Sequence, residues 1–211
     1  MDLKCGIFDM DGTLIDSMPM WRNLGRNILL RRGVEPRPDF GEAMKPLTMR
    51  EGCAYCKLNY DLTESVEEII EECFGMVRDF YQTQAEPLPG VPAFLAKLRE
   101  QGVKLYVATA TDRPLAEIAL RTAGLTDCFD GMLTCAEAGA NKQTPDIYEQ
   151  TLALAGCEKT DAVVFEDALY AIRTAKGAGF RVAAIHDPAL TESHAEIRSL
   201  ADYYVETYEA L

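Results

Sequence analysis

Two carboxylates, Asp9 and Asp11, stand two residues apart directly after a short apolar run near the start of the chain. That run, residues 3–8, has the continuous apolar character of a strand buried on both faces of a parallel sheet. If the strand continues to Asp9, this side chain emerges at the carboxyl end of the sheet, where α/β proteins bind ligands. Burying acids is unfavourable unless a cation, a ligand or a reaction uses them. The pair therefore predicts a catalytic or metal-binding site, with a polar turn after an edge strand as the alternative.

Three later segments carry groups with related chemistry. An apolar strand at residues 105–109 ends in the hydroxyl of Thr109, and a second, at residues 163–167, ends in Glu166 and Asp167. Between these two strands, Lys142 opens the stretch Lys-Gln-Thr-Pro-Asp-Ile-Tyr. Acids, a hydroxyl and an amine together are the groups that phosphoryl transfer needs for attack, charge neutralisation and proton transfer.

In this order, the four segments resemble the four motifs of the haloacid dehalogenase superfamily. The sequence D-x-D-G-T-L at residues 9–14 is similar to the first motif, and K-x-x-P-D-x-[YF] at residues 142–148 is similar to the stretch with the family lysine. The resemblance extends from residue 3 to about residue 180 and is closest to the phosphatase and β-phosphoglucomutase-like subgroup, which has a helical cap. It implies that the strands ending at Asp9, Thr109 and Asp167 are neighbours in one sheet.

The expected fold class is α/β. The C-terminal part of the chain alternates strand-like and helical patterns, which predicts a parallel sheet with right-handed crossovers. Residues 17–86 interrupt this alternation, because residues 20–30 and 66–81 have apolar positions at helical spacing and no strand is convincing. We therefore predict a Rossmann-like three-layer core formed by residues 1–16 and 87–211, with an inserted all-helical domain at residues 17–86. In the resembled family such an insertion is a cap that closes over the site.

Composition excludes several classes of partner. A formal net charge of −13 argues against nucleic-acid binding and against attraction to anionic membranes. Asp9 and Asp11 interrupt the N-terminal apolar run, so it is neither a signal segment nor a membrane span. The seven cysteines are expected to be free thiols of a cytoplasmic protein. Cys53 and Cys56 have the spacing of metal ligands, but the sequence has no second Cys/His pair to complete a metal site. No exposed apolar stripe indicates an oligomer, so a monomer is expected.

The first two acids have distinct predicted roles. Asp9 can act as the nucleophile and form an aspartyl-phosphate, the role that the resemblance also assigns to it. Asp11 can give a proton to the leaving alkoxide and later take one from water. In the resembled family a dehalogenase, which expels halide, usually lacks an acid at this position. Asp11 therefore favours a phosphatase or a phosphomutase over a dehalogenase.

A magnesium ion is the predicted cofactor. Asp167, with Glu166 beside it, should meet Asp9 around Mg²⁺, which favours carboxylate, water and phosphate oxygens. The resemblance adds the backbone carbonyl of Asp11 as a ligand. The alternative for Glu166 and Asp167 is an N-cap of the helix that follows them.

The substrate phosphate has candidate ligands of its own. The hydroxyl of Thr109 and the backbone N–H groups of Ala110 and Thr111 can cradle it, and Lys142 can neutralise its charge while pairing with Asp9. Arg50 lies in a segment, residues 45–51, where related caps carry a substrate-contacting arginine. The alternatives are a solvated lysine for Lys142 and a surface salt bridge for Arg50.

The leading hypothesis is a Mg²⁺-dependent phosphatase that hydrolyses a small phosphorylated metabolite through an aspartyl-phosphate. The first alternative is a phosphomutase of the β-phosphoglucomutase type. Such mutases place a cap histidine near the position of Trp21, and this chain has none there. The second alternative is a non-catalytic protein that binds a phosphorylated ligand.

Overall fold

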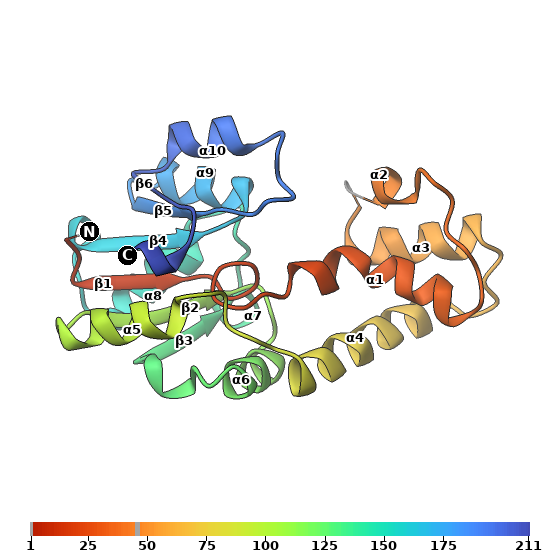
Figure 1. The fold of residues 1–211 in the computed structure, drawn as a ribbon, viewed down its shortest axis with the longest axis horizontal. Coiled ribbons are helices and arrows are strands. Elements are labelled where there is room, and N and C mark those ends of the chain that lie inside the picture. Colours follow the sequence, from red (N-terminus) through yellow and green to blue (C-terminus); the bar gives the residue numbers. More distant parts are fainter. Residues whose placement is uncertain (1, 45–46) are drawn as a thin grey trace. The chain divides into compact units, whose positions relative to one another are not determined.

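A parallel sheet of six strands, in the order β3-β2-β1-β4-β5-β6, organises most of the chain in the computed structural model (Figure 1). The structure describes residues 2–44 and 47–211. The strands are β1 (Cys5–Phe8), β2 (Lys104–Thr109), β3 (Gly131–Thr134), β4 (Ala162–Glu166), β5 (Arg181–Ile185) and β6 (Tyr203–Val205). Every strand pairs in parallel with its neighbours, which confirms the predicted α/β class.

The sheet belongs to one of two units into which the chain divides. This core unit consists of Met1–Ser17 and Ala85–Leu211, and the helical unit consists of Met18–Gln84. The helices of the core unit are α5 (Val91–Glu100), α6 (Arg113–Thr122), α7 (Cys135–Ala138), α8 (Asp146–Ala155), α9 (Leu169–Gly177) and α10 (His194–Leu200). Three short 3₁₀ turns complete it: η1 (Thr126–Cys128), η2 (Lys159–Asp161) and η3 (Tyr208–Ala210).

Helices cover both faces of the sheet, so the core unit has three layers. Ile7 and Val164 belong to a buried cluster with residues of α8, α9 and α10. The alternate residues Phe8 and Phe165 stack on each other at 4.1 Å between ring centroids, and Phe165 meets Phe94 of α5. Because both faces are buried, β1 and β4 are apolar without alternation.

The helical unit contains α1 (Met18–Arg31), α2 (Phe40–Met44), α3 (Met49–Asn59) and α4 (Val66–Thr83) (Figure 1). Capping boxes begin two of these helices: Thr48 with Glu51 at α3, and Ser65 with Glu68 at α4. In each box the side chains satisfy backbone N–H groups that have no partner in the first helical turn. Helices α1, α3 and α4 contact one another.

The described residues of the helical unit contain no strand. Across the described part of the chain, no helix combines the length and apolar character that crossing a membrane requires.

Candidate active site

Three strand ends bring the candidate catalytic groups together. Strand β1 lies between β2 and β4 and runs parallel to both. Asp9 directly follows β1, and its N–H donates to the carbonyl oxygen of Phe165 at 3.0 Å, so the pairing with β4 continues to this residue. Thr109 ends β2 and Glu166 ends β4. Because the strands are parallel, all these groups lie at one edge of the sheet.

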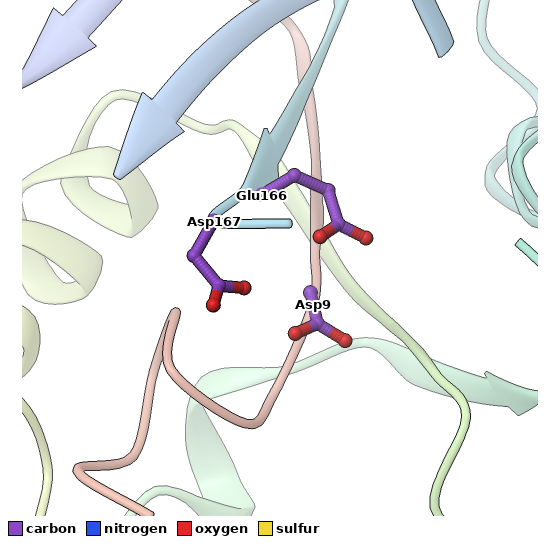
Figure 2. A group of neighbouring side chains, drawn as sticks. All are labelled: Asp9, Glu166 and Asp167. Atoms are coloured by element: carbon purple, nitrogen blue, oxygen red, sulfur yellow. The ribbon is translucent and has the colours of Figure 1, made fainter. Parts of the chain in front are cut away.

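The carboxylates of Asp9, Glu166 and Asp167 form a compact buried cluster, and Figure 2 shows the three side chains close together. One oxygen from each residue lies within 4.8 Å of the others. The three residues are 7%, 1% and 3% exposed. Such a group of hard oxygen donors fits Mg²⁺, which takes carboxylate oxygens and retains waters in its remaining positions.

Lys142 is the cation in this cluster. Its ammonium group donates to Asp9, and also to Oε1 of Glu166 at 2.6 Å, and the residue is 4% exposed. Burial opposes the charged form, but Asp9 and Glu166 outweigh it and raise the pKa of Lys142 above its usual value. The ammonium is therefore protonated at neutral pH.

The cluster contains more carboxyl groups than the single ammonium of Lys142 can neutralise. Burial raises the pKa of Asp9 well above its usual value, with Lys142 opposing the shift and the neighbouring acids adding to it. Burial and the charge of Glu166 raise the pKa of Asp167 to about 7. Three carboxylates against one ammonium leave two negative charges when all are ionised, which is the charge that one divalent cation neutralises.

Glu166 has a further partner that sequence reasoning did not single out. The hydroxyl of Tyr148, on α8, donates to its Oε1 at 2.9 Å, and both residues are buried. Another unpredicted contact fixes Asp167, because the Thr13 hydroxyl donates to its Oδ1 at 3.3 Å. Thr13 lies in the motif at residues 9–14 and Tyr148 in the motif at residues 142–148, and this position within the motifs could have indicated a role in the site.

Asp11 is held at both oxygens. Ser17 donates to Oδ1 at 2.6 Å, and the hydroxyl of Thr111 donates to Oδ2 at 2.7 Å. Asp11 thus lies at the same sheet edge, in contact with the segment after β2. Thr111 was predicted only as a backbone donor, and Ser17 was not predicted at all.

The loop after β2 carries the predicted phosphate ligands. Thr109 is 1% exposed, whereas Ala110 is exposed. The Thr111 N–H donates to Oγ1 of Thr109 at 3.0 Å. To bind a phosphate, this N–H would have to be shared between the anion and the Thr109 hydroxyl.

Arg50 lies on the first turn of α3, in the helical unit. It pairs with Glu67 at 2.8 Å, and both side chains are about two-thirds exposed, at 65% and 68%. This is the surface salt bridge that the sequence left as an alternative. Residues 45 and 46 of the same segment lie outside the described residues.

Comparison with known proteins identifies the family of the chain. The family model described as haloacid dehalogenase-like hydrolase matches residues 6–185. The chain is 31% identical to fructose-1-phosphate phosphatase of Escherichia coli over 82% of this chain and 91% of that protein. It is 25% identical to hexitol phosphatase B of Escherichia coli over 95% of this chain and 94% of that protein.

A solved structure is similar over nearly the whole chain. It is a protein of Thermotoga maritima described as a "putative beta-phosphoglucomutase", with a TM-score of 0.86 and 26% identity, covering 98% of this chain and 96% of that one. The family match spans β1 to β5 and includes all four motifs. The chain therefore belongs to the haloacid dehalogenase-like hydrolase family.

Proposed function

We propose that the protein is a Mg²⁺-dependent phosphatase that hydrolyses a small phosphorylated carbohydrate or polyol through an aspartyl-phosphate on Asp9. The observation that carries the proposal is the buried cluster of Asp9, Glu166 and Asp167 with Lys142 donating to two of its members. Such a cluster is unfavourable for stability alone, and its groups suit phosphoryl transfer.

In the first step, a carboxylate oxygen of Asp9 attacks the phosphorus atom and the bond to the substrate oxygen breaks. The ammonium of Lys142 favours the ionised form of Asp9, against the effect of burial, and neutralises charge on the phosphoryl oxygens. In the second step, water attacks the phosphorus atom and the Asp9 carboxylate is regenerated.

Asp11 is proposed as the general acid and base. It gives its proton to the leaving alkoxide in the first step and takes one from the attacking water in the second. Its hydrogen bonds from Ser17 and Thr111 fix the orientation of the carboxyl group. An acid at this position can protonate an alkoxide leaving group, whereas a halide leaves as the anion and needs no proton.

Asp9, Glu166 and Asp167 would hold the divalent cation, together with the backbone carbonyl of Asp11. When bound, this cation supplies positive charge that orients the phosphate group and stabilises the charge of the transition state.

The substrate class rests on the relatives, which act on fructose 1-phosphate and hexitol phosphates according to their names. We propose the helical unit as the cap that contacts the substrate beyond its phosphate. The support is its place in the chain, between β1 and β2, and its helical content.

The decisive test is Asp9→Asn, assayed by phosphate release from a panel of sugar phosphates, hexitol phosphates and phosphoglycolate. We expect hydrolysis to fall by at least about 1,000-fold, because the amide is a poor nucleophile. Circular dichroism checks the fold, and mass spectrometry excludes deamidation back to Asp. Turnover near the wild-type rate in Asp9→Asn protein of verified mass would refute the nucleophile assignment.

A phosphomutase is the second candidate, because the Thermotoga maritima structure described as a beta-phosphoglucomutase is similar over nearly the entire chain. The two histidines of the chain both lie in the core unit, where His186 contacts the Tyr204 hydroxyl and His194 contacts the Asp187 carbonyl oxygen. The helical unit thus offers no imidazole as a base for a second sugar hydroxyl. Incubation with glucose 1-phosphate and a sugar bisphosphate should release phosphate, whereas isomerisation without release would favour the mutase.

A further inference from the structure

Three buried thiols lie in the helical unit, and none of them belongs to the proposed catalytic groups. Cys53 and Cys56 stand one turn apart on α3, and Cys73 lies on α4. They are 4%, 1% and 2% exposed, and all three are free. The Sγ atoms of Cys53 and Cys73 are 3.9 Å apart, in direct contact across the two helices.

Metal binding does not account for this pair. Among the residues that the structure describes, the only group of three or more potential ligands close enough to hold one ion is Asp9, Glu166 and Asp167. A structural metal site of the thiolate type uses four ligands in a tetrahedral arrangement. The described residues provide no such ligand set around Cys53 and Cys73. Two thiols in contact are instead suited to forming a disulfide.

We propose that Cys53 and Cys73 are a redox-active pair that closes to a reversible disulfide between α3 and α4 in the presence of a hydroperoxide. In the first step, the Cys53 thiol ionises, its thiolate attacks the terminal peroxide oxygen, and the O–O bond breaks. Cys53 becomes a sulfenic acid, and the hydroxide or alkoxide that leaves takes up the proton released by Cys53 to give water or an alcohol. In the second, the Cys73 sulfur attacks the Cys53 sulfur, and the hydroxyl of the sulfenic acid leaves as water with the Cys73 proton. The peroxide is reduced by two electrons, and the two thiols are oxidised.

The surroundings distinguish the two cysteines of α3. The contact with the Cys73 thiol lowers the pKa of Cys53; burial opposes this shift, and the positive charge of Arg50 adds to it. Burial instead raises the pKa of Cys56 to about 11. Since the thiolate is the reactive form, Cys53 is the thiol of this group that attacks first.

The pair is close to bonding distance but still needs local movement. The sulfur atoms must approach from 3.9 Å to about 2.05 Å, which side-chain rotation and a small shift between the helices can provide. Peroxide reaches the buried sulfurs through local opening of the helices. The product would tie α3 to α4 and restrict the unfolded chain between them.

The experiment uses the full chain, reduced and then treated with a small excess of hydrogen peroxide. Free thiols are alkylated, and tryptic peptides are analysed without reduction. Trypsin cleavage after Arg50, Lys57 and Arg78 gives peptide 51–57 with Cys53 and Cys56, and peptide 58–78 with Cys73. We expect these two peptides to be linked, the link to disappear with dithiothreitol, and oxidation to raise the Tm of the helical unit by about 5 °C.

Because one peptide holds both α3 cysteines, variants identify the bond. Cys56→Ala, the matched control one turn away, should retain the link at the wild-type level, whereas Cys53→Ala and Cys73→Ala should lose it. The proposal is overturned if Cys56→Ala loses the link and Cys53→Ala keeps it. It is also overturned if the peroxide converts Cys53 to sulfinic acid while Cys73 stays reduced. These outcomes do not depend on phosphatase activity, so they are separate from the test of Asp9.

Discussion

Glu166 has the most unexpected surroundings of any single residue in the candidate site. The donors Lys142 and Tyr148 both reach its Oε1, at 2.6 Å and 2.9 Å. Neither of these two contacts engages Oε2. The side chain is thus held by one oxygen, which fixes its orientation relative to Asp9 and Asp167.

Tyr148→Phe tests this arrangement. Removal of the hydroxyl leaves Glu166 with Lys142 and frees it to rotate, so the affinity for Mg²⁺ should fall by about 10-fold, as for other residues that orient metal ligands. Isothermal titration calorimetry measures the affinity directly. In phosphatase assays the Mg²⁺ concentration for half-maximal rate should rise by a similar factor, with kcat at saturating Mg²⁺ little changed.

Tyr208→Phe is the matched control for this variant. Tyr208 is also a buried tyrosine of the core unit, but among the described residues its hydroxyl has no hydrogen-bond partner. Removing an unpaired buried hydroxyl costs no hydrogen bond, so Mg²⁺ affinity should stay at the wild-type value. Equal losses in both variants would contradict a specific role for Tyr148.

Asp167 makes the stability of the metal-free protein depend on pH. Its pKa is about 7 in the folded state, against an ordinary value of 3.8. Between these values the folded state holds a proton that the unfolded state has released, so this group lowers stability as pH rises from about 4 to about 7. Denaturant titrations in EDTA across this range should show the decline, and Asp167→Asn should make it shallower, because Asp9, whose pKa is also raised, contributes in the same direction. An unchanged slope in the variant would assign the dependence to other groups.

At the scale of elements, strand β1 positions Asp9 through its packing. Phe8 stacks on Phe165 of β4, and its ring also folds back over Gly6 on the same face of the strand. A Cβ atom at Gly6 would lie 2.5 Å from the Phe8 ring. Because Phe8 is held between Phe165 and Phe129, the ring cannot swing aside without disturbing the core.

Gly6→Ala should therefore destabilise the core unit by about 1–3 kcal/mol, the usual cost of overpacking. Gly177→Ala is the control in the same unit, because a methyl group added at this last residue of α9 would meet no atom within 4 Å. It should be neutral or stabilising by up to about 1 kcal/mol. Guanidinium unfolding compares the two variants, and equal stability of both would show that the Phe8 ring yields easily.

For the whole molecule, the proposed cation links the active site to the stability of the core unit. Neutralisation of the excess negative charge at the ends of β1 and β4 should stabilise the folded state, since the unfolded chain does not assemble the cluster. At a Mg²⁺ concentration 100 times its Kd, the gain is about 2.7 kcal/mol.

Thermal unfolding in Mg²⁺ and in EDTA measures this link. The wild-type core unit should unfold at a higher temperature in Mg²⁺, and the shift should be lost in Asp167→Asn. Glu35→Gln, an exposed acid of the helical unit, is a control for general charge effects and should keep the shift. If the Asp167 variant kept the full shift, the cation would bind elsewhere.

Much of the fold could be predicted from local patterns. The apolar runs before Asp9, Thr109 and Asp167 became the central strands β1, β2 and β4, and residues 66–81 lie within α4. Helix α3 lies in the region predicted to be all-helical, but its bounds were not predicted, and helix α5 was not predicted. The capping box of Thr48 and Glu51 begins α3, but glycine, two cysteines and polar residues obscure its apolar period. Strand β6 is three residues long, too short for a pattern to indicate it.

The amino-acid sequence by itself determined the chemical types of the site and their order at strand ends, because apolar runs specify buried strands and the parallel alternation brings their ends to one edge. Only the tertiary structure decided which groups meet. Thr111 reaches Asp11 from 100 residues away, and Thr13 reaches Asp167 from 154 residues away. Tyr148 meets Glu166, and Cys53 meets Cys73, through the packing of helices. Such contacts depend on how the helices and strands pack and on which side-chain rotamers the packing allows. The spacing of residues along the chain specifies neither of these.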